Sequence, residues 1–334
     1  MSEKTLNMEM ANLVCRFGGD KVLLDLEEDV VLPSFFDSSL IRTYDKTSYF
    51  FYDVEAIKFE EDDEPVVCIS GRFIKDTTLE REQIFDRKRG LVQDSDSMRS
   101  SPSAIFLLIL NNHRLIYVKE TKNAPSKETF RSTLLNFLRS KHKHFINAEF
   151  ERYKEGSDQK VTKKSLYERY PRPSLDLIPL TSDESIESFV RNYETLKYIE
   201  ISLSDRNDEN DNDPFFEQLQ KRKDYLGSDK SVVQHRNSQG LDKEKAISEI
   251  GEATAQGNQK VKLNGIDSEG DVLRGNNEEF QLRKPLEGLS KTPSKAAEKL
   301  YDTFKSLIDD GLVKVPPTSQ KAKGIVSRIA KRLF

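Results

Sequence analysis

Tryptophan is absent from this chain of 334 residues, and cysteine occurs only twice. Two cysteines cannot supply a zinc site made of thiolates alone, or the disulfide framework of a secreted scaffold. Cys15 and Cys68 both stand among apolar residues, so we expect each to be a small, buried side chain. The first ten residues lack the apolar core of a signal peptide, and the longest apolar run, six residues, is far too short to cross a bilayer. These absences predict a cytoplasmic protein with no integral membrane segment.

Motifs that mark nucleotide hydrolysis or the common hydrolase classes are also missing. No G-x-x-x-x-G-K-[ST], G-x-G-x-x-G, G-x-S-x-G or H-E-x-x-H occurs. The acid-rich stretches 205–213 and 267–271 lack the spacing of an EF-hand, and we interpret them as solvated loops. Of the four histidines only His142 and His144 are close in sequence, and no cysteine accompanies them. The sequence therefore predicts neither a metal site nor a cofactor.

The most strongly patterned stretch that is present is 103–122, SAIFLLILNNHRLIYVKETK. Six consecutive apolar residues, the turn-forming pair Asn111-Asn112 and a second apolar run predict a buried β-hairpin at the centre of a sheet. Ser126 is a suitable N-cap for a helix that follows. An apolar stripe at helical spacing then predicts that this helix packs across the hairpin; it consists of Phe130, Leu134, Phe137 and Leu138.

Other segments of the range 1–155 also indicate strands. Four of them have alternating, apolar or aromatic-rich patterns, namely 13–17, 22–26, 48–59 and 66–74. The first two flank a Gly18-Gly19 turn and predict a second hairpin. The acids of 60–64 indicate a solvated loop, and the charged stretch 75–102 indicates a long excursion that is partly helical near 79–86. Residues 1–155 are therefore predicted to form an antiparallel sheet with a helix on one face.

Residues 174–317 predict a second α+β domain beyond a junction near 155–173. A strand at 175–180, a helix opened by a Thr181–Glu184 capping box and a strand at 198–203 indicate a β-α-β unit. Further elements follow in the order helix, helix, strand, strand, helix, at 215–226, 244–255, 260–266, near 280–283 and 292–311. The order β-α-β then β-β-α is compatible with a ferredoxin-like variant, or with another α+β layer arrangement.

Positive charge is concentrated in two regions, although the whole chain carries −4. Residues 131–173 hold eleven cationic and five acidic residues, a local net charge of +6. The tail 318–334 holds five cations and no acid, and it is amphipathic if helical. Cationic side chains neutralise nucleic-acid phosphates. The nucleic-acid-binding candidates are Arg139, Lys141, Lys143, Arg152, Lys163, Lys164, Lys321, Lys323, Arg328, Lys331 and Arg332.

Aromatic residues are interleaved with the cations of 131–173: Phe137, Phe145, Phe150, Tyr153, Tyr167 and Tyr170. Such rings can stack on the unpaired bases of RNA or single-stranded DNA. The alternative is that they point into a core, as we expect for Phe137. The tail can bind nucleic acid, an acidic partner or an anionic membrane, and its alternative is a packed or disordered end.

Two short patterns resemble nuclease motifs. Arg139 and His144 have the R-x4-H spacing of the HEPN ribonucleases, in which the histidine would transfer a proton and the arginine would stabilise the phosphate. Glu120 and Lys122 resemble the E-x-K of PD-(D/E)xK nucleases, in which the carboxylate holds Mg²⁺. That fold also requires an upstream aspartate, for which Asp53 or the acids of 60–64 are the nearest candidates. In both cases the alternative is an ordinary solvated end of a helix or strand.

The order of FLLILNNHRLIYVKE, a helix led by Pro-Ser and a later VKLNGIDSEGD hairpin resembles an uncharacterised family of bacterial proteins that is loosely associated with phage-defence loci. The resemblance covers roughly 105–140 and 260–283. It implies a defence context and assigns no functional residue.

We therefore expect a non-catalytic subunit of a bacterial anti-phage assembly. Its expected partners are nucleic acid, as RNA or single-stranded DNA, and a partner protein or a second copy of the chain. The alternatives are a nuclease that uses one of the two candidate pairs, and a purely structural interaction subunit.

Overall fold

Both apolar runs of the stretch 103–122 form strands and pair with each other. The computed structural model describes residues 5–19, 21–61, 64–156, 161–203, 205–207 and 213–334. In it β6 (Ser103–Ile109) and β7 (Arg114–Lys119) form an antiparallel hairpin, in register from Ala104 opposite Lys119 to Ile109 opposite Arg114. The predicted hairpin is confirmed.

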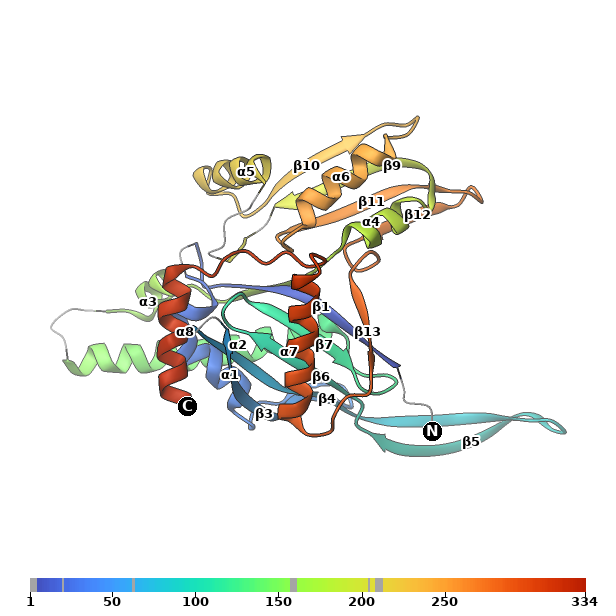
Figure 1. Ribbon diagram of the computed structural model, residues 1–334. Helices are drawn as coiled ribbons and strands as arrows, with labels where there is room; N and C mark the ends of the chain where they lie inside the picture. Colours follow the sequence, from blue (N-terminus) through green and yellow to red (C-terminus); the bar gives the residue numbers. More distant parts are fainter. Residues whose placement is uncertain (1–4, 20, 62–63, 157–160, 204, 208–212) are drawn as a thin grey trace.

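The described residues form one large and one small antiparallel sheet (Figure 1). The other strands of the large sheet are β1 (Thr5–Arg16), β2 (Arg42–Tyr44), β3 (Thr47–Glu61), β4 (Glu64–Asp86), β5 (Gly90–Ser100), β8 (Ser174–Pro179) and β13 (Arg283–Glu287). The small sheet consists of β9 (Tyr193–Leu203), β10 (Ser231–Arg236), β11 (Gln259–Asp267) and β12 (Val272–Asn276). The order of the large sheet is β13-β1-β7-β6-β4-β3-β2, with β8 also on β1 and β5 also on β4, and the order of the small sheet is β10-β9-β11-β12.

The helices cover both faces of the large sheet and one face of the small one. They are α1 (Leu32–Phe36), α2 (Lys127–Gly156), α3 (Lys163–Arg169), α4 (Asp183–Val190), α5 (Pro214–Tyr225), α6 (Lys243–Thr254), α7 (Pro293–Asp309) and α8 (Gln320–Leu333). No helix among the described residues is long and apolar enough to cross a membrane. The α+β class with antiparallel sheets is confirmed.

The side chains of β6 alternate between two apolar cores, as the pleat of a strand requires. The face toward α1, α2 and α8 carries Ala104, Phe106 and Leu108, and the face toward α7 carries Ile105, Leu107 and Ile109. Six consecutive apolar residues leave both faces of the strand apolar, so helices must cover both sides. The helix expected on one face is α2, and α7 forms a second layer on the other.

Helix α2 begins as the sequence predicts. The Ser126 hydroxyl accepts a hydrogen bond from the backbone N–H of Thr129 at 3.1 Å, and all four residues of the apolar stripe are buried. No glycine or proline interrupts the sequence between Ser126 and Gly156, so the helix continues for 30 residues. Its C-terminal half extends past the edge of the sheet (Figure 1).

The turn of the central hairpin differs from the expected geometry. The residue with positive φ is His113, at +56°, rather than Asn111 or Asn112. Asn111 contributes through its side chain, which accepts from the backbone N–H of Val67 and donates to the carbonyl of Pro65, both at 3.0 Å. The asparagine therefore fixes the turn against β4 and does not provide the left-handed residue.

Two predictions for the range 1–155 are wrong. The expected strand 22–26 is a 3₁₀ turn (Leu23–Leu26), followed by a π-helical segment (Glu27–Val31) that leads into α1. The Asp25 carboxylate accepts from the backbone N–H of Val22 at 2.9 Å, which closes the turn, and its leucines enter the core. The expected excursion 75–102, partly helical near 79–86, is instead a two-stranded β-ribbon with one irregularity between Arg81 and Gln83. Apolar residues face each other across it, as Phe85 faces Leu91, and such cross-strand pairs stabilise strands.

The second half is not the single ferredoxin-like layer that its element order suggested. Strands β8 and β13 pair with β1 in the large sheet, while β9, β11 and β12 belong to the small sheet. Segments of the ranges 1–155 and 174–317 thus share one sheet. The cap of α4 also shifts by one position: Ser182 and Ser185 form it, while Thr181 donates to the hydroxyl of Thr254 at 2.8 Å.

A buried polar cluster joins the small sheet to the large one. The Arg114 side chain is fully buried and donates to Asn12 Oδ1 at 2.8 Å and to the Gln256 carbonyl at 3.2 Å. Asn12 Nδ2 in turn donates to the Gly257 carbonyl at 3.1 Å. These bonds hold the turn between α6 and β11 against β1 and β7, because breaking them would leave buried polar groups unsatisfied.

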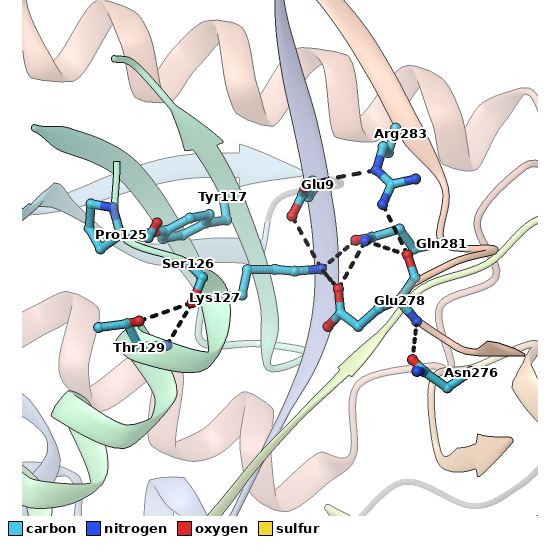
Figure 2. A network of polar contacts seen from close by, with 10 residues as sticks. All are labelled: Glu9, Tyr117, Pro125, Ser126, Lys127, Thr129, Asn276, Glu278, Gln281 and Arg283. Carbon is cyan, nitrogen blue, oxygen red and sulfur yellow. Dashed lines mark hydrogen bonds and ion pairs between the residues drawn. The ribbon is translucent and has the colours of Figure 1, made fainter. Parts of the chain in front are cut away.

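A buried lysine fixes the start of α2 (Figure 2). Lys127 is 5 % exposed, and its Nζ lies 3.4 Å from Glu9 on β1 and 3.3 Å from Glu278. It also donates a hydrogen bond to the side-chain oxygen of Gln281, and Arg283 approaches Glu9 from the other side. A cation in the first turn opposes the helix dipole, so the two carboxylates provide the compensation.

Lys127→Met should destabilise the protein by about 3 kcal/mol, because it leaves the poorly solvated Glu9 carboxylate without its closest cation. Urea unfolding of both proteins measures the difference. The double variant Lys127→Met/Glu9→Gln should recover part of the loss. The exposed Lys122→Met is the control and should stay within about 0.5 kcal/mol of wild type. A loss in Lys127→Met no larger than in the control would contradict this role.

Candidate nucleic-acid interface

The outward face of α2 carries a polar stripe. Arg139, Lys143 and Asn147 recur every four residues, so they lie on one side of the helix over about 12 Å. Helix α3 follows, and its Lys163 Nζ donates to Asn147 Oδ1 at 2.8 Å. Three cations from two helices thereby lie along one surface.

The cations of this surface differ in whether an acid compensates them. Arg139, Lys143 and Lys164 are exposed, and none of them forms an ion pair within the part of the chain that the structure describes. Lys163 donates to an amide oxygen and forms no ion pair with a residue that the structure describes. We define Arg139, Lys143, Lys163 and Lys164 as the α2–α3 basic surface. Free cationic groups can bind phosphate without first breaking an ion pair.

Two predicted candidates on α2 are held in ion pairs instead. Lys141 is bonded to the Asp37 carboxylate just after α1. That bond, with further hydrogen bonds from Ser39, holds the pKa of Asp37 well below its usual range. Arg152 pairs with Glu149 at 2.9 Å on the same helix. Lys141 thus connects α2 to α1, and its position favours a structural role.

Three of the five tail cations are also in ion pairs. Lys321 lies 2.7 Å from Asp25, Lys323 lies 2.8 Å from Glu64, and Arg332 lies 2.6 Å from Glu27. The apolar face of α8, with Val326 and Ile329, is buried against the core shared with α2. Only Arg328 and Lys331 lack an ion pair among the described residues. The tail is thus a packed helix.

The aromatic residues of the region are largely covered by the protein's own cations. Arg169 lies 5.4 Å from the ring centre of Tyr170 and donates to the Tyr153 hydroxyl at 3.0 Å. Arg172 lies 5.5 Å from the Tyr167 ring, and Lys163 lies 5.4 Å from the Phe150 ring. Phe137 is buried as expected, and Phe145 packs against the same core. These contacts compete with base stacking and favour contacts to phosphates.

The pair Arg139 and His144 does not converge on one point. The two residues are five positions apart on α2, which places them about 140° apart around the helix. The neighbouring His142 points inward: it stacks on Phe17 with ring centres 5.9 Å apart, and its Nε2 lies 3.0 Å from the Tyr170 carbonyl. Burial lowers the pKa of His142, the bond to Tyr170 opposes the shift, and the nearby Arg172 lowers it further.

The Glu120–Lys122 candidate is organised around an arginine that sequence reasoning missed. Arg72 of β4 lies 3.2 Å from Glu120 and 3.4 Å from Asp53, so its guanidinium joins the two proposed metal-binding carboxylates. Lys122 is exposed in the turn after β7. The described residues contain no group of three His, Cys, Asp or Glu side chains that could hold a metal ion. This geometry favours an ion-paired strand end over a Mg²⁺ site.

The structure adds one cationic group that the sequence analysis did not single out. Arg87, Lys88 and Arg89 form the tip of the β4–β5 ribbon, between Asp86 and Gly90. The signal in the sequence is D-R-K-R-G, a turn pattern with three consecutive cations. Because 79–86 was expected to be partly helical, a hairpin turn at 87–89 was not predicted.

His142 should make stability depend on pH. Because its folded pKa is depressed, the unfolded state binds more protons near and below the ordinary histidine pKa of about 6.5. Its stabilising contribution is therefore complete above that pH and is lost as the pH falls through the lower, folded pKa. The free energy of unfolding of wild type should decrease between pH 7.5 and 5.5, and His142→Gln should reduce this decrease. The exposed His144→Gln is the matched control, and identical pH profiles for the two variants would contradict the assignment.

Comparison with known proteins assigns no family to the chain. No family model matches it, and no curated protein matches it significantly. The candidate interface therefore depends on the arrangement of charges in this structure.

Proposed function

We propose that this protein is a non-catalytic nucleic-acid-binding subunit that holds the phosphate backbone on its α2–α3 basic surface. The observation that carries the proposal is that some cations of this region have an acid beside them and others do not. Lys141 and Arg152 of α2 lie beside an acid, as do Lys321, Lys323 and Arg332 of α8, whereas Arg139, Lys143 and Lys164 are exposed and form no ion pair with a described residue. Uncompensated cations on one surface bind a polyanion even when the net charge of the chain is −4, because the local field decides the contact.

The contact proposed here is with phosphates and is independent of base sequence. The cations that cover Tyr167 and Tyr170 supply further positive charge beside the surface. Phosphate contacts position a nucleic acid without reading its sequence. A scaffold with these properties suits a subunit that brings nucleic acid to an assembly, and the resemblance noted for 105–140 and 260–283 supports a bacterial defence context for it.

Charge reversal of the α2–α3 basic surface should weaken binding. The triple variant Arg139→Glu/Lys143→Glu/Lys164→Glu should bind a labelled nucleic acid about tenfold or more weakly at 0.1 M salt. The slope of log affinity against log salt should decrease in magnitude by about 2 to 3, because each phosphate contact contributes about 0.9 for duplex DNA. Fluorescence anisotropy at several salt concentrations measures both quantities.

A matched control carries the same change of charge elsewhere. Lys221→Glu/Arg222→Glu/Lys245→Glu alters exposed cations on α5 and α6. This variant should keep the salt slope of wild type. Equal losses in both triple variants would show only a response to net charge, and unchanged binding in the first would contradict the proposal.

The non-catalytic part of the proposal has its own test. Single- and double-stranded DNA and RNA should stay intact when incubated with the purified protein, with and without Mg²⁺, because Arg72 already pairs with Glu120 and Asp53. Gel electrophoresis of the products measures this. Cleavage that disappears in Glu120→Ala or in His144→Ala would establish one of the two nuclease alternatives instead.

A further inference from the structure

The ribbon formed by β4 and β5 projects away from the rest of the molecule (Figure 1). From Thr77 to Asp86, β4 pairs with β5 in a register that runs from Thr77 opposite Ser100 to Asp86 opposite Gly90. Ten residues of strand correspond to about 33 Å. A two-stranded ribbon standing alone is only marginally stable in water. A ribbon of this length that projects from the rest of the protein therefore indicates a contact with a partner molecule.

The tip of the ribbon is a tight turn that presents its cations outward. The Asp86 carboxylate accepts from the backbone N–H groups of Lys88 and Arg89, at 2.8 and 2.9 Å. Gly90 has φ of +74°, the left-handed residue that a three-residue hairpin loop requires. The carboxylate of Asp86 is thus bonded to the backbone of the turn and not to its cations. Arg87, Lys88 and Arg89 are all exposed.

The cations on the shaft of the ribbon lie beside acids, and those at the tip do not. Arg81 lies 2.8 Å from Asp94 and 3.4 Å from Asp96, and Arg99 lies 3.1 Å from Asp76. By contrast, the three cations of the tip form no ion pair with any described part of the chain. The positive charge of the arm is thus concentrated at its end, which points to an anionic partner.

An exposed apolar pair lies directly behind these cations. Phe85 and Leu91 face each other across the ribbon and are 73 % and 69 % exposed. Exposed apolar side chains of this size, next to three cations, are suited to a partner with a charged rim and an apolar interior. The major groove of a DNA duplex has phosphates along its edges, and the thymine methyl groups at its floor accept apolar contacts.

We propose that the tip of the β4–β5 ribbon inserts into a groove of double-stranded DNA. The major groove of B-form DNA is about 12 Å wide and accepts a two-stranded β-ribbon. Arg87, Lys88 and Arg89 then contact the phosphates along the groove, and Phe85 and Leu91 contact thymine methyl groups on the base edges. The inference rests on the proposed function, which requires nucleic acid, and it names the duplex form and a second point of contact.

Tryptophan substitution provides a direct reporter because the chain contains none. In Phe85→Trp, the fluorescence of the introduced indole should be quenched when a 30-base-pair DNA duplex is added. Met98→Trp places the same probe on the shaft, about 20 Å from the tip and also exposed, and it should not respond. An indole at position 85 that stays unchanged at saturating DNA would overturn the inference, as would a stronger response to anionic phospholipid vesicles.

Removal of the tip charge is the second arm of the experiment. Arg87→Ser/Lys88→Ser/Arg89→Ser should lower duplex affinity about tenfold and the salt slope by about 2 to 3, whereas Lys221→Ser/Arg222→Ser/Lys245→Ser should change neither. A duplex of RNA, whose major groove is deep and narrow, should bind the tip variant and wild type equally. Wild-type affinity for DNA in the tip variant overturns this inference alone. Failure of wild type to bind any nucleic acid overturns the proposed function as well.

Discussion

The burial of β6 and β7 on both faces is the constraint on which the rest of the structure depends. A run of six apolar residues cannot leave either face of the sheet to solvent, so α2 covers one face and α7 the other. Helix α2 contributes its inner stripe to this core and continues for 30 residues. Its outer face is then free for charged residues. Helix α3 lies beside the C-terminal half of α2, where Lys163 donates to Asn147. The candidate interface is thus a consequence of how the central hairpin is covered.

Ion pairing separates structural cations from available ones. Lys127 and Lys141 connect α2 to β1 and to the end of α1, and Lys323 and Arg332 connect α8 to acids of the large-sheet unit. Each of these cations is fixed by the fold. Exposed cations that form no ion pair with a described residue include Arg139, Lys143 and Lys164 on α2 and α3, and Arg87, Lys88 and Arg89 at the tip of the β4–β5 ribbon. A chain of net negative charge can therefore present two local positive surfaces, since the local arrangement of charges, and not the net charge, decides the field at each surface.

The elements whose apolar pattern and capping residues lie within one short segment were predictable from sequence. The apolar runs of 105–118, the cap at Ser126 and the stripe from Phe130 to Leu138 all appear in the structure as expected. Elements that depend on distant partners were not. The segment 22–26 looks like a strand, but Asp25 closes a 3₁₀ turn there. The segment 175–180 looks like part of a β-α-β unit, but it pairs with β1 instead. The basic region was visible as composition, but no sequence pattern shows that Lys141 meets Asp37, or that Arg72 meets Glu120.

Lysine acetylation in the presence and absence of DNA, read residue by residue by mass spectrometry, tests the central claim most directly. If uncompensated cations form the interface, bound duplex DNA should protect Lys143 and Lys164 on the α2–α3 basic surface and Lys88 at the ribbon tip. The ion-paired Lys46 and Lys323, which are also accessible, should react equally with and without DNA. Protection of Lys46 and Lys323 to the same degree as Lys143 and Lys164 would contradict the account.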